Sequence, residues 1–288
     1  MSGIPVQFDG YYINLDTSVD RDARMRQQLA ALRIAGTYRR FEAIRGAGTP
    51  QRSQTTLTDG HLGCWLSHQA VWMQGIRAGR HLHVLEDDAI LSPLLVQMLE
   101  KPNLDEDGWD LLFTDVYFHP PPSPVQFTQL MNWMQAFARG KGVVLADLKD
   151  LPFTGTTSYL VNHRGMEKLL ALTDGQWTLN RSFDVHLQEL VRQGKVRARV
   201  TVPFVSTIGP ENLATTTGSQ GPALAALNAF REALYYRADP SAIYARIRPC
   251  ECRTETATAP LLGIYLELLR NVLGTLDTAP DQAGETQG

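Results

Sequence analysis

His81–Leu91, HLHVLEDDAIL, is the stretch from which the fold can be read. Its apolar run Val84–Leu85 leads directly into three consecutive acids, Glu86–Asp88, after which apolar residues resume. A short apolar run is typical of a buried strand, and ligand sites in open α/β sheets lie just beyond the carboxyl ends of such strands. The sequence therefore predicts an α/β protein with a ligand site at the acidic stretch.

The three adjacent carboxylates point to a metal ion. They repel one another and resist desolvation unless a positive group lies among them. Carboxylates suit Mn²⁺ or Mg²⁺, which in turn hold phosphate oxygens. Because side chains alternate along a strand, Glu86 and Asp88 share one side and are the expected ligands, with Asp87 on the other. The alternative is a solvated turn whose acids precede a helix near Ser92–Pro93.

Composition excludes several classes of protein. The chain has 288 residues, with hydrophobic and charged fractions that are ordinary for a globular protein. A net charge of -3 gives no basic field for nucleic acid. Three cysteines are too few for a disulfide framework, and no apolar run is long enough to cross a bilayer. Without a recognisable signal peptide, we expect a cytoplasmic protein with at most peripheral membrane association.

Strand and helix patterns alternate over the first two thirds of the chain. Besides the run before Glu86, predicted strands are 11–15, 38–44, 109–113, the end of 155–161, and 196–204. Predicted helices are 20–32, 57–77, 93–99, 127–138, 164–172 and 184–191. We expect one unit over 1–206 and a helical extension over 207–288 that ends in a disordered tail. The apolar helix 260–276 could pack on the core, form a homodimer seam or lie at a membrane interface.

Several side chains outside the acidic stretch are also candidates for function. Arg21 and Arg24 follow the first strand and could meet a phosphate or form a solvated face. His61, Cys64 and His68 share one helix face and could hold zinc, although Cys64 could equally be packed in the core. Ser67 and His68 point about 100° apart, which argues against a nucleophile and base.

Later candidates have two readings each. Asp115 could touch a sugar hydroxyl or cap a turn. Asp184 could cap the helix that it begins or act as a catalytic base. His186 could complete the metal shell or lie satisfied in a pocket. The proline-rich stretch His119–Pro124 cannot be a regular helix or central strand, and we expect it to be a stiff loop at an acceptor-binding rim.

Taken in order, these motifs resemble glycosyltransferase family 25, which holds lipopolysaccharide-type bacterial glycosyltransferases and collagen galactosyltransferases. The likeness covers about residues 10–205. It rests on Ile13-Asn14-Leu15-Asp16 and the Arg-rich helix after it, Leu57-Thr58, Gly63-Cys64-Trp65-Leu66-Ser67-His68, Leu85-Glu86-Asp87-Asp88-Ala89, Gly155 to Leu170, and Phe183-Asp184.

The resemblance implies a GT-A-like, Rossmann-type fold: a mixed, mostly parallel sheet flanked by helices, with a helical C-terminal extension. Residues 1–206 would be the nucleotide-sugar-binding catalytic domain. A Mn²⁺ (or Mg²⁺) ion would bridge the donor diphosphate. Glu86, Asp88 and His186 would hold this ion, Asp184 would be the catalytic base, and the nucleotide-sugar would contact Asn14, Asp16, Arg21, Arg24, His68 and Asp87.

The implied activity is metal-dependent transfer of a sugar, with galactose expected, from a UDP-sugar to a hydroxyl of a glycan or glycoconjugate such as lipopolysaccharide. His61 stands where the family usually has Glu, so a catalytically impaired nucleotide-sugar-binding module is one alternative. A metal-dependent phosphoester hydrolase is another, because it would also use clustered acids. A possible homodimer would form through the C-terminal helix.

Overall fold

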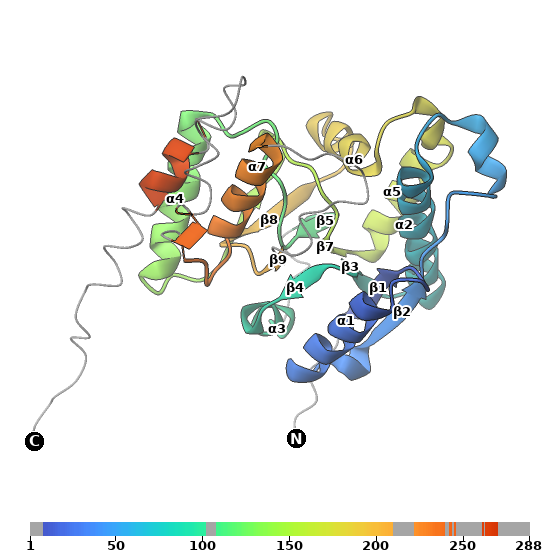
Figure 1. The fold of residues 1–288 in the computed structure, drawn as a ribbon, viewed down its shortest axis with the longest axis horizontal. Helices are drawn as coiled ribbons and strands as arrows, with labels where there is room; N and C mark the ends of the chain where they lie inside the picture. The colour runs from blue at the N-terminus through green and yellow to red at the C-terminus, as the bar shows by residue number, and fades with distance from the viewer. Residues whose placement is uncertain are drawn as a thin grey trace, which may run out of the picture.

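A mixed seven-stranded sheet forms the centre of the protein (Figure 1). The computed structural model describes residues 8–101, 108–209, 222–239, 242–243, 245, 261 and 263–269. The strands of the large sheet are β1 (Phe8–Asn14), β2 (Tyr38–Glu42), β3 (His81–Glu86), β5 (Leu111–Phe113), β6 (Val144–Asp147), β7 (Ser158–Val161) and β8 (Ala198–Val202). They lie in the order β2-β1-β3-β7-β5-β8-β6.

The sheet is mostly parallel, as predicted. β1 pairs in parallel with β2 and β3, and β5 pairs in parallel with β8. Only β7, between β3 and β5, and the edge strand β6 run the other way, so five of the seven strands share one direction. The carboxyl ends of β1, β2 and β3 therefore meet at one edge, where Ile13 lies opposite both Phe41 and Glu86.

Helices cover both faces of this sheet. They are α1 (Val19–Ala31), α2 (Asp59–Ala78), α3 (Pro93–Leu99), α4 (Pro124–Ala138), α5 (His163–Thr173), α6 (Phe183–Arg192) and α7 (Pro222–Ala233). Alternate strand residues enter two apolar clusters: Val84 of β3 belongs to the cluster that includes α2 and α5, and Leu85 belongs to the cluster that includes α1 and α3. Burial on both faces explains why this strand reads as an uninterrupted apolar run.

A second, two-stranded sheet follows the acidic motif, by which we mean Glu86–Asp88. After a turn at Asp87–Asp88, β4 (Ala89–Leu91) pairs antiparallel with β9 (Ser206–Ile208). The sequence pattern predicted neither this pairing nor β6, and it merged β8 with the residues after it. Short strands with long-range partners carry too few residues to show a periodicity of their own.

The described part of the C-terminal segment packs on the main core. Phe230 of α7 lies 6.1 Å from the ring of Phe127 in α4, and Tyr265 stacks on Phe127 at 3.9 Å. Phe204, just after β8, exchanges backbone hydrogen bonds with Leu234 and Tyr236. Of the three readings of the apolar helix 260–276, packing on the core is what its described residues show; the homodimer seam stays a prediction.

Two further expectations concern this segment and its surroundings. The predicted disordered tail from Thr278 lies outside the described residues. No helix among the residues that the structure describes is long and apolar enough to cross a membrane.

The proline-rich stretch ends as the N-terminus of α4, where Ser123 and Gln126 form a capping box and Pro124 takes the first helical position.

The close approach of α2 to the loop after β2 depends on a glycine. A Cβ on Gly63 would lie 2.5 Å from the carbonyl oxygen of Ile44, whereas one on Gly60 in the same helix would meet no heavy atom nearer than 3.9 Å. We expect Gly63→Ala to lower the free energy of unfolding by about 1–3 kcal/mol relative to Gly60→Ala, because both gain helix propensity and only the first clashes. Thermal unfolding of the two variants measures this difference, and equal stabilities would contradict it.

Candidate functional site

A pocket of about 500 Å³ opens beyond the carboxyl ends of β1, β2 and β3. Its walls are the residues after β1, the loop 43–47 after β2, residues of α2 between Asp59 and His68, and the acidic motif. Ser67 fixes one wall, because its buried hydroxyl accepts a hydrogen bond from the Ile44 amide (2.9 Å) and donates one to the Gly63 carbonyl (2.7 Å). That hydroxyl has a structural role, in line with the expectation that Ser67 is not a nucleophile.

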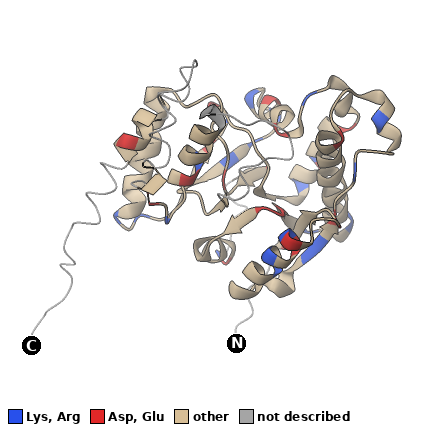
Figure 2. Cartoon of the chain, viewed as in Figure 1, with Lys and Arg blue, Asp and Glu red and all other residues tan. Residues whose placement is uncertain are grey.

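The carboxylate of Asp87 already has hydrogen-bond partners within the protein. Its carboxylate accepts hydrogen bonds from Asn14 Nδ2 at 2.8 Å and from Arg21 Nη1 at 3.0 Å. Asn14 is buried, and its amide also donates to the Ser18 carbonyl and accepts from Arg40. The side chains of Asn14 and Asp87 therefore tie β1, β2 and β3 together. Arg21 has five N–H donors, so it can bind a ligand as well as Asp87. Figure 2 shows acidic positions, in red, at the junction of β3 and β4, close to the basic positions, in blue, on α1.

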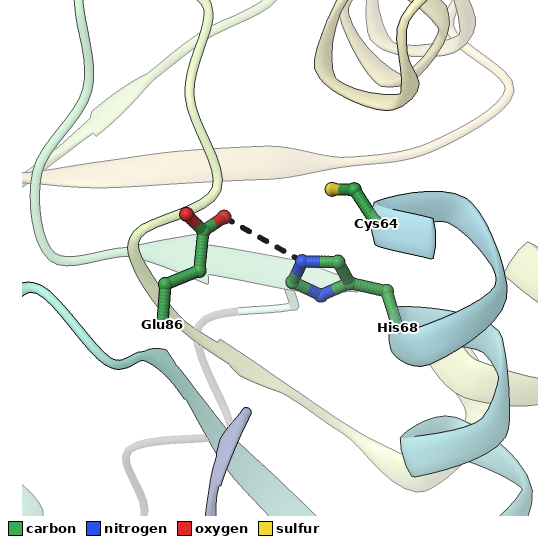
Figure 3. A group of neighbouring side chains, drawn as sticks. All are labelled: Cys64, His68 and Glu86. Atoms are coloured by element: carbon green, nitrogen blue, oxygen red, sulfur yellow. Dashed lines mark ion pairs between the residues drawn. The ribbon is translucent and has the colours of Figure 1, made fainter. Parts of the chain in front are cut away.

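Glu86 is held in place through one oxygen. Its Oε1 accepts a hydrogen bond from Thr156 Oγ1 at 2.6 Å and lies 3.5 Å from His68 Nε2. Figure 3 shows the His68 ring, on α2, facing this carboxylate. Burial raises the pKa of Glu86, but its contacts with His68 and Thr156 and the positive charge of Arg231 together lower it more, so the net shift is downward. Among the described residues no hydrogen bond reaches Oε2, so this oxygen can bind a cation.

A hydrogen-bond chain behind His68 sets which ring nitrogen carries the proton. Trp72 Nε1 can only donate, and it donates to Tyr159 Oη at 3.0 Å. Tyr159 Oη lies 2.8 Å from His68 Nδ1 and has its own proton to give there. A neutral His68 then carries its proton on Nε2, facing Glu86. The geometry assigns His68 as a donor that orients Glu86, a role that sequence spacing cannot reveal.

Asp88 has an unsatisfied carboxylate oxygen. Its Oδ1 is buried without a hydrogen-bond partner among the described residues, and Oδ2 lies 4.0 Å from Arg21 Nη1. Burial raises the pKa of Asp88 to about 7, and the negative charge of Glu86 adds to this rise. A buried oxygen without a donor is costly, and a divalent cation would satisfy it. Glu86 and Asp88 therefore fit the Mn²⁺ or Mg²⁺ that the acidic motif implies.

A second group of possible ligands lies on the same wall. Ligand atoms of Cys64, His68 and Glu86 all lie within 4.8 Å of one another (Figure 3). Burial, followed by the charges of Glu86 and Asp184, raises the pKa of the Cys64 thiol, which disfavours the thiolate that zinc needs. His61 does not belong to this group, and its Nδ1 lies 3.0 Å from Thr58 Oγ1. The predicted zinc site of His61, Cys64 and His68 therefore lacks one of its three ligands.

Asp184 lies in the first turn of α6. Its Oδ2 accepts a hydrogen bond from the Gly155 amide at 3.0 Å, and its Oδ1 accepts one from the Val185 amide at 2.9 Å. These bonds anchor the carboxylate at the start of the helix, but Ser182 is the N-cap residue of α6, so Asp184 is a first-turn residue and not the cap. Its negative charge also acts on Cys64, a residue of the pocket wall. The catalytic reading of Asp184 is compatible with this position and stays a prediction.

The remaining expected residues lie at different depths. Asp16 is exposed, with Oδ1 3.8 Å from Arg40 Nη2. Arg24 is exposed and, with Arg21, lines a hollow of about 280 Å³ at the start of α1. His186 is buried against the Trp65 ring at 5.3 Å and is not part of the Cys64–His68–Glu86 group. The structure gives His186 a packing environment and no contact with the acidic motif among those described.

One buried ion pair near the motif has no counterpart in the sequence-based expectations. Arg231 of α7 bonds Asp115, which follows β5, and its guanidinium lies 4.3 Å from the centre of the Tyr117 ring. Asp115 is fully buried, and the hydrogen bonds described for its carboxylate go to the side chains of Ser206 and Arg231 and not to a turn amide; contact with a sugar hydroxyl stays a prediction. Arg231 and Asp115 are 116 residues apart, and no local pattern links them.

A pocket beyond the carboxyl ends of a mostly parallel α/β sheet lies where such folds bind their ligands. The model of glycosyltransferase family 25, described as LPS biosynthesis protein, matches residues 8–184. The chain belongs to this family, and it is a glycosyltransferase. Membership implies a nucleotide-sugar donor and a glycan acceptor. No curated protein matches the chain.

The burial of Asp88 gives a stability prediction. With a folded-state pKa of about 7 against an ordinary value of 3.8, the folded protein binds more protons between these pH values, so its free energy of unfolding falls as pH rises through them. Without metal, Asp88→Asn should therefore raise stability at pH 8 by at least about 1 kcal/mol, roughly 2–4 °C, and by less at pH 5. Thermal unfolding at both pH values measures this, with the exposed Asp16→Asn as control. A gain that is independent of pH, or a loss at pH 8, would contradict the assignment.

Proposed function

We propose that the protein transfers a sugar, with galactose the first candidate, from a UDP-sugar to a hydroxyl of a glycan or glycoconjugate such as lipopolysaccharide, and that the reaction needs Mn²⁺ or Mg²⁺. The observation that carries the proposal is that two carboxylates lining the pocket each have an oxygen without a hydrogen bond among the described residues. Glu86 has one oxygen held and one open, and Asp88 has a buried oxygen without a partner.

The residues of the acidic motif have different proposed roles. Glu86 and Asp88 would hold the cation, which when bound supplies positive charge to the diphosphate leaving group. Asp87 keeps the strand ends together through Asn14 and Arg21. His68 and Thr156 fix the orientation of Glu86, as partners behind a metal ligand commonly do.

The pocket supports a nucleotide-sugar donor. Its volume of about 500 Å³ falls within the usual range for small-molecule and cofactor sites. Gly46 and Gly63 both line it, and because neither carries a Cβ, the loop after β2 and the start of α2 can pack closely against each other and form one continuous wall. Arg21 and Arg45 add positive charge to the lining. The choice of uridine over other bases rests on the family resemblance and is what the nucleotide titration below tests.

Asp184 is the proposed base for the acceptor hydroxyl. A base must be anchored and must lie near the bound donor, and Asp184 has two backbone hydrogen bonds and lies close enough to the pocket for its charge to act on Cys64. A carboxylate in the first turn of a helix is also favoured electrostatically, because the N-terminal end of a helix carries partial positive charge.

Metal-dependent binding of UDP is the first test. Titration calorimetry with UDP, GDP and CMP, each with Mn²⁺ and with EDTA, should show binding of UDP only in the presence of the metal. Asp88→Asn should lose this binding while remaining folded, and the control Asp150→Asn, at an exposed residue that does not line the pocket, should bind as the unaltered protein does. Mn²⁺-dependent UDP binding at unaltered affinity in Asp88→Asn would show that the metal lies elsewhere.

Substitution of Asp184 is expected to separate binding of the nucleotide from transfer of the sugar. Asp184→Asn keeps the shape of the side chain and should bind UDP with Mn²⁺ as before, but it should transfer sugar at least about 100-fold more slowly, because a general base contributes roughly that much or more. Single-turnover transfer to a glycan acceptor measures the rate. An unchanged rate would remove Asp184 from the mechanism, and UDP-sugar binding with no transfer by the unaltered protein would favour a non-catalytic binding module.

A further inference from the structure

Arg231 is a buried cation with unused hydrogen-bond donors. Its side chain is 1% exposed, its Nη2 bonds Asp115, and its guanidinium covers the ring of Tyr117. Its Nε and Nη1 are buried without a hydrogen-bond partner among the residues described. Burial alone would lower the pKa of Arg231, but the carboxylate of Asp115 more than offsets this, so the guanidinium stays charged. A charged group with unmet donors in the interior calls for an acceptor.

The topology brings Arg231 to the acidic motif. β4 follows the motif directly and pairs with β9, whose first residue is Ser206. Ser206 Oγ donates to Asp115 Oδ1 at 3.1 Å, and Asp115 in turn bonds Arg231. The carboxylate of Asp88 lies near enough to Arg231 to support, after Asp115 and Tyr117, the positive charge of the guanidinium. Through β4, β9 and Asp115 the guanidinium is therefore a neighbour of the acidic motif.

Arg231 and Asp88 attract each other but do not touch. The ion pair described for Arg231 is with Asp115, while Asp88 Oδ1 and Arg231 Nη1 each lack a partner among the described residues. One ligand could satisfy both groups if it presented a cation to Asp88 and anionic oxygens to Arg231. A metal-bound diphosphate has this composition, and the planar guanidinium fork suits phosphate oxygens.

We propose that Arg231 binds a phosphate oxygen of the nucleoside diphosphate, so that the C-terminal segment completes the donor site. The proposal rests on the proposed function. It extends the site beyond residues 8–184, the part of the chain that the family model matches. In this position the guanidinium would stabilise the negative charge that develops on the departing diphosphate.

The proposal predicts that loss of Arg231 weakens binding of UDP and does not weaken binding of Mn²⁺. A cation beside Asp88 repels Mn²⁺ and attracts phosphate. Arg231→Gln should therefore weaken UDP binding in the presence of Mn²⁺ by roughly tenfold or more, since the bond lost is between charged groups. It should leave binding of uridine, which has no phosphate, unchanged, and should not weaken binding of Mn²⁺ alone. Arg231→Lys should recover part of the UDP affinity because it restores the charge without the fork.

A paired variant separates this role from a structural one. Asp115→Asn with Arg231→Gln replaces the buried ion pair by two neutral amides of similar shape, which avoids leaving one charge buried alone. Thermal unfolding should show that the paired variant is more stable than Arg231→Gln, while its UDP affinity should stay low. If UDP affinity returns together with stability, or if UDP, uridine and Mn²⁺ all weaken in parallel in Arg231→Gln, Arg231 is structural and the proposal is wrong.

The same titrations distinguish this failure from failure of the proposed function. Absence of Mn²⁺-dependent UDP binding by the unaltered protein would overturn both. Binding by the unaltered protein together with an unchanged UDP affinity in Arg231→Gln would overturn the role of Arg231 alone.

Discussion

Repulsion among the three carboxylates that end β3 is the constraint on which the site depends. Neighbouring side chains offset this repulsion at Asp87 and Glu86 more than at Asp88. Asp87 is bonded by Asn14 and Arg21, and Glu86 by Thr156 and His68, whereas Asp88 keeps a buried oxygen without a partner among the described residues. The negative charge that the described residues leave without a partner therefore lies at Asp88, where we propose that a cation binds. Residues that precede and residues that follow the acidic motif in the sequence contribute to this arrangement.

The fold explains why such a motif is stable enough to exist. Parallel pairing brings the ends of β1, β2 and β3 together, so Asn14 can bond Asp87 across strands. β7 enters antiparallel beside β3, and this brings Tyr159 near His68 and Thr156 near Glu86. The side chains that orient Glu86 therefore come from the helix before β3 and from the residues that begin β7. Reversal of one central strand is part of the site's construction.

Sequence reasoning found what is local and missed what is long-range. The apolar run into Glu86–Asp88, the arginines of α1 and the order of strands and helices are short-range patterns, and the α/β fold and the family followed from them. His68 was expected at the site, but its role depends on Tyr159, 91 residues away. Arg231 lay in a segment that the family likeness did not reach. His186 was proposed as a ligand because spacing cannot tell which helix face packs against Trp65.

The position of the metal tests the account most directly. Crystals of the protein soaked with Mn²⁺ and UDP would reveal the ion through its anomalous scattering. The account predicts an ion bound between Oε2 of Glu86 and Oδ1 of Asp88, with diphosphate oxygens completing its shell. An ion between Cys64 and His68, or UDP bound in the pocket with no ion at Asp88, would contradict it.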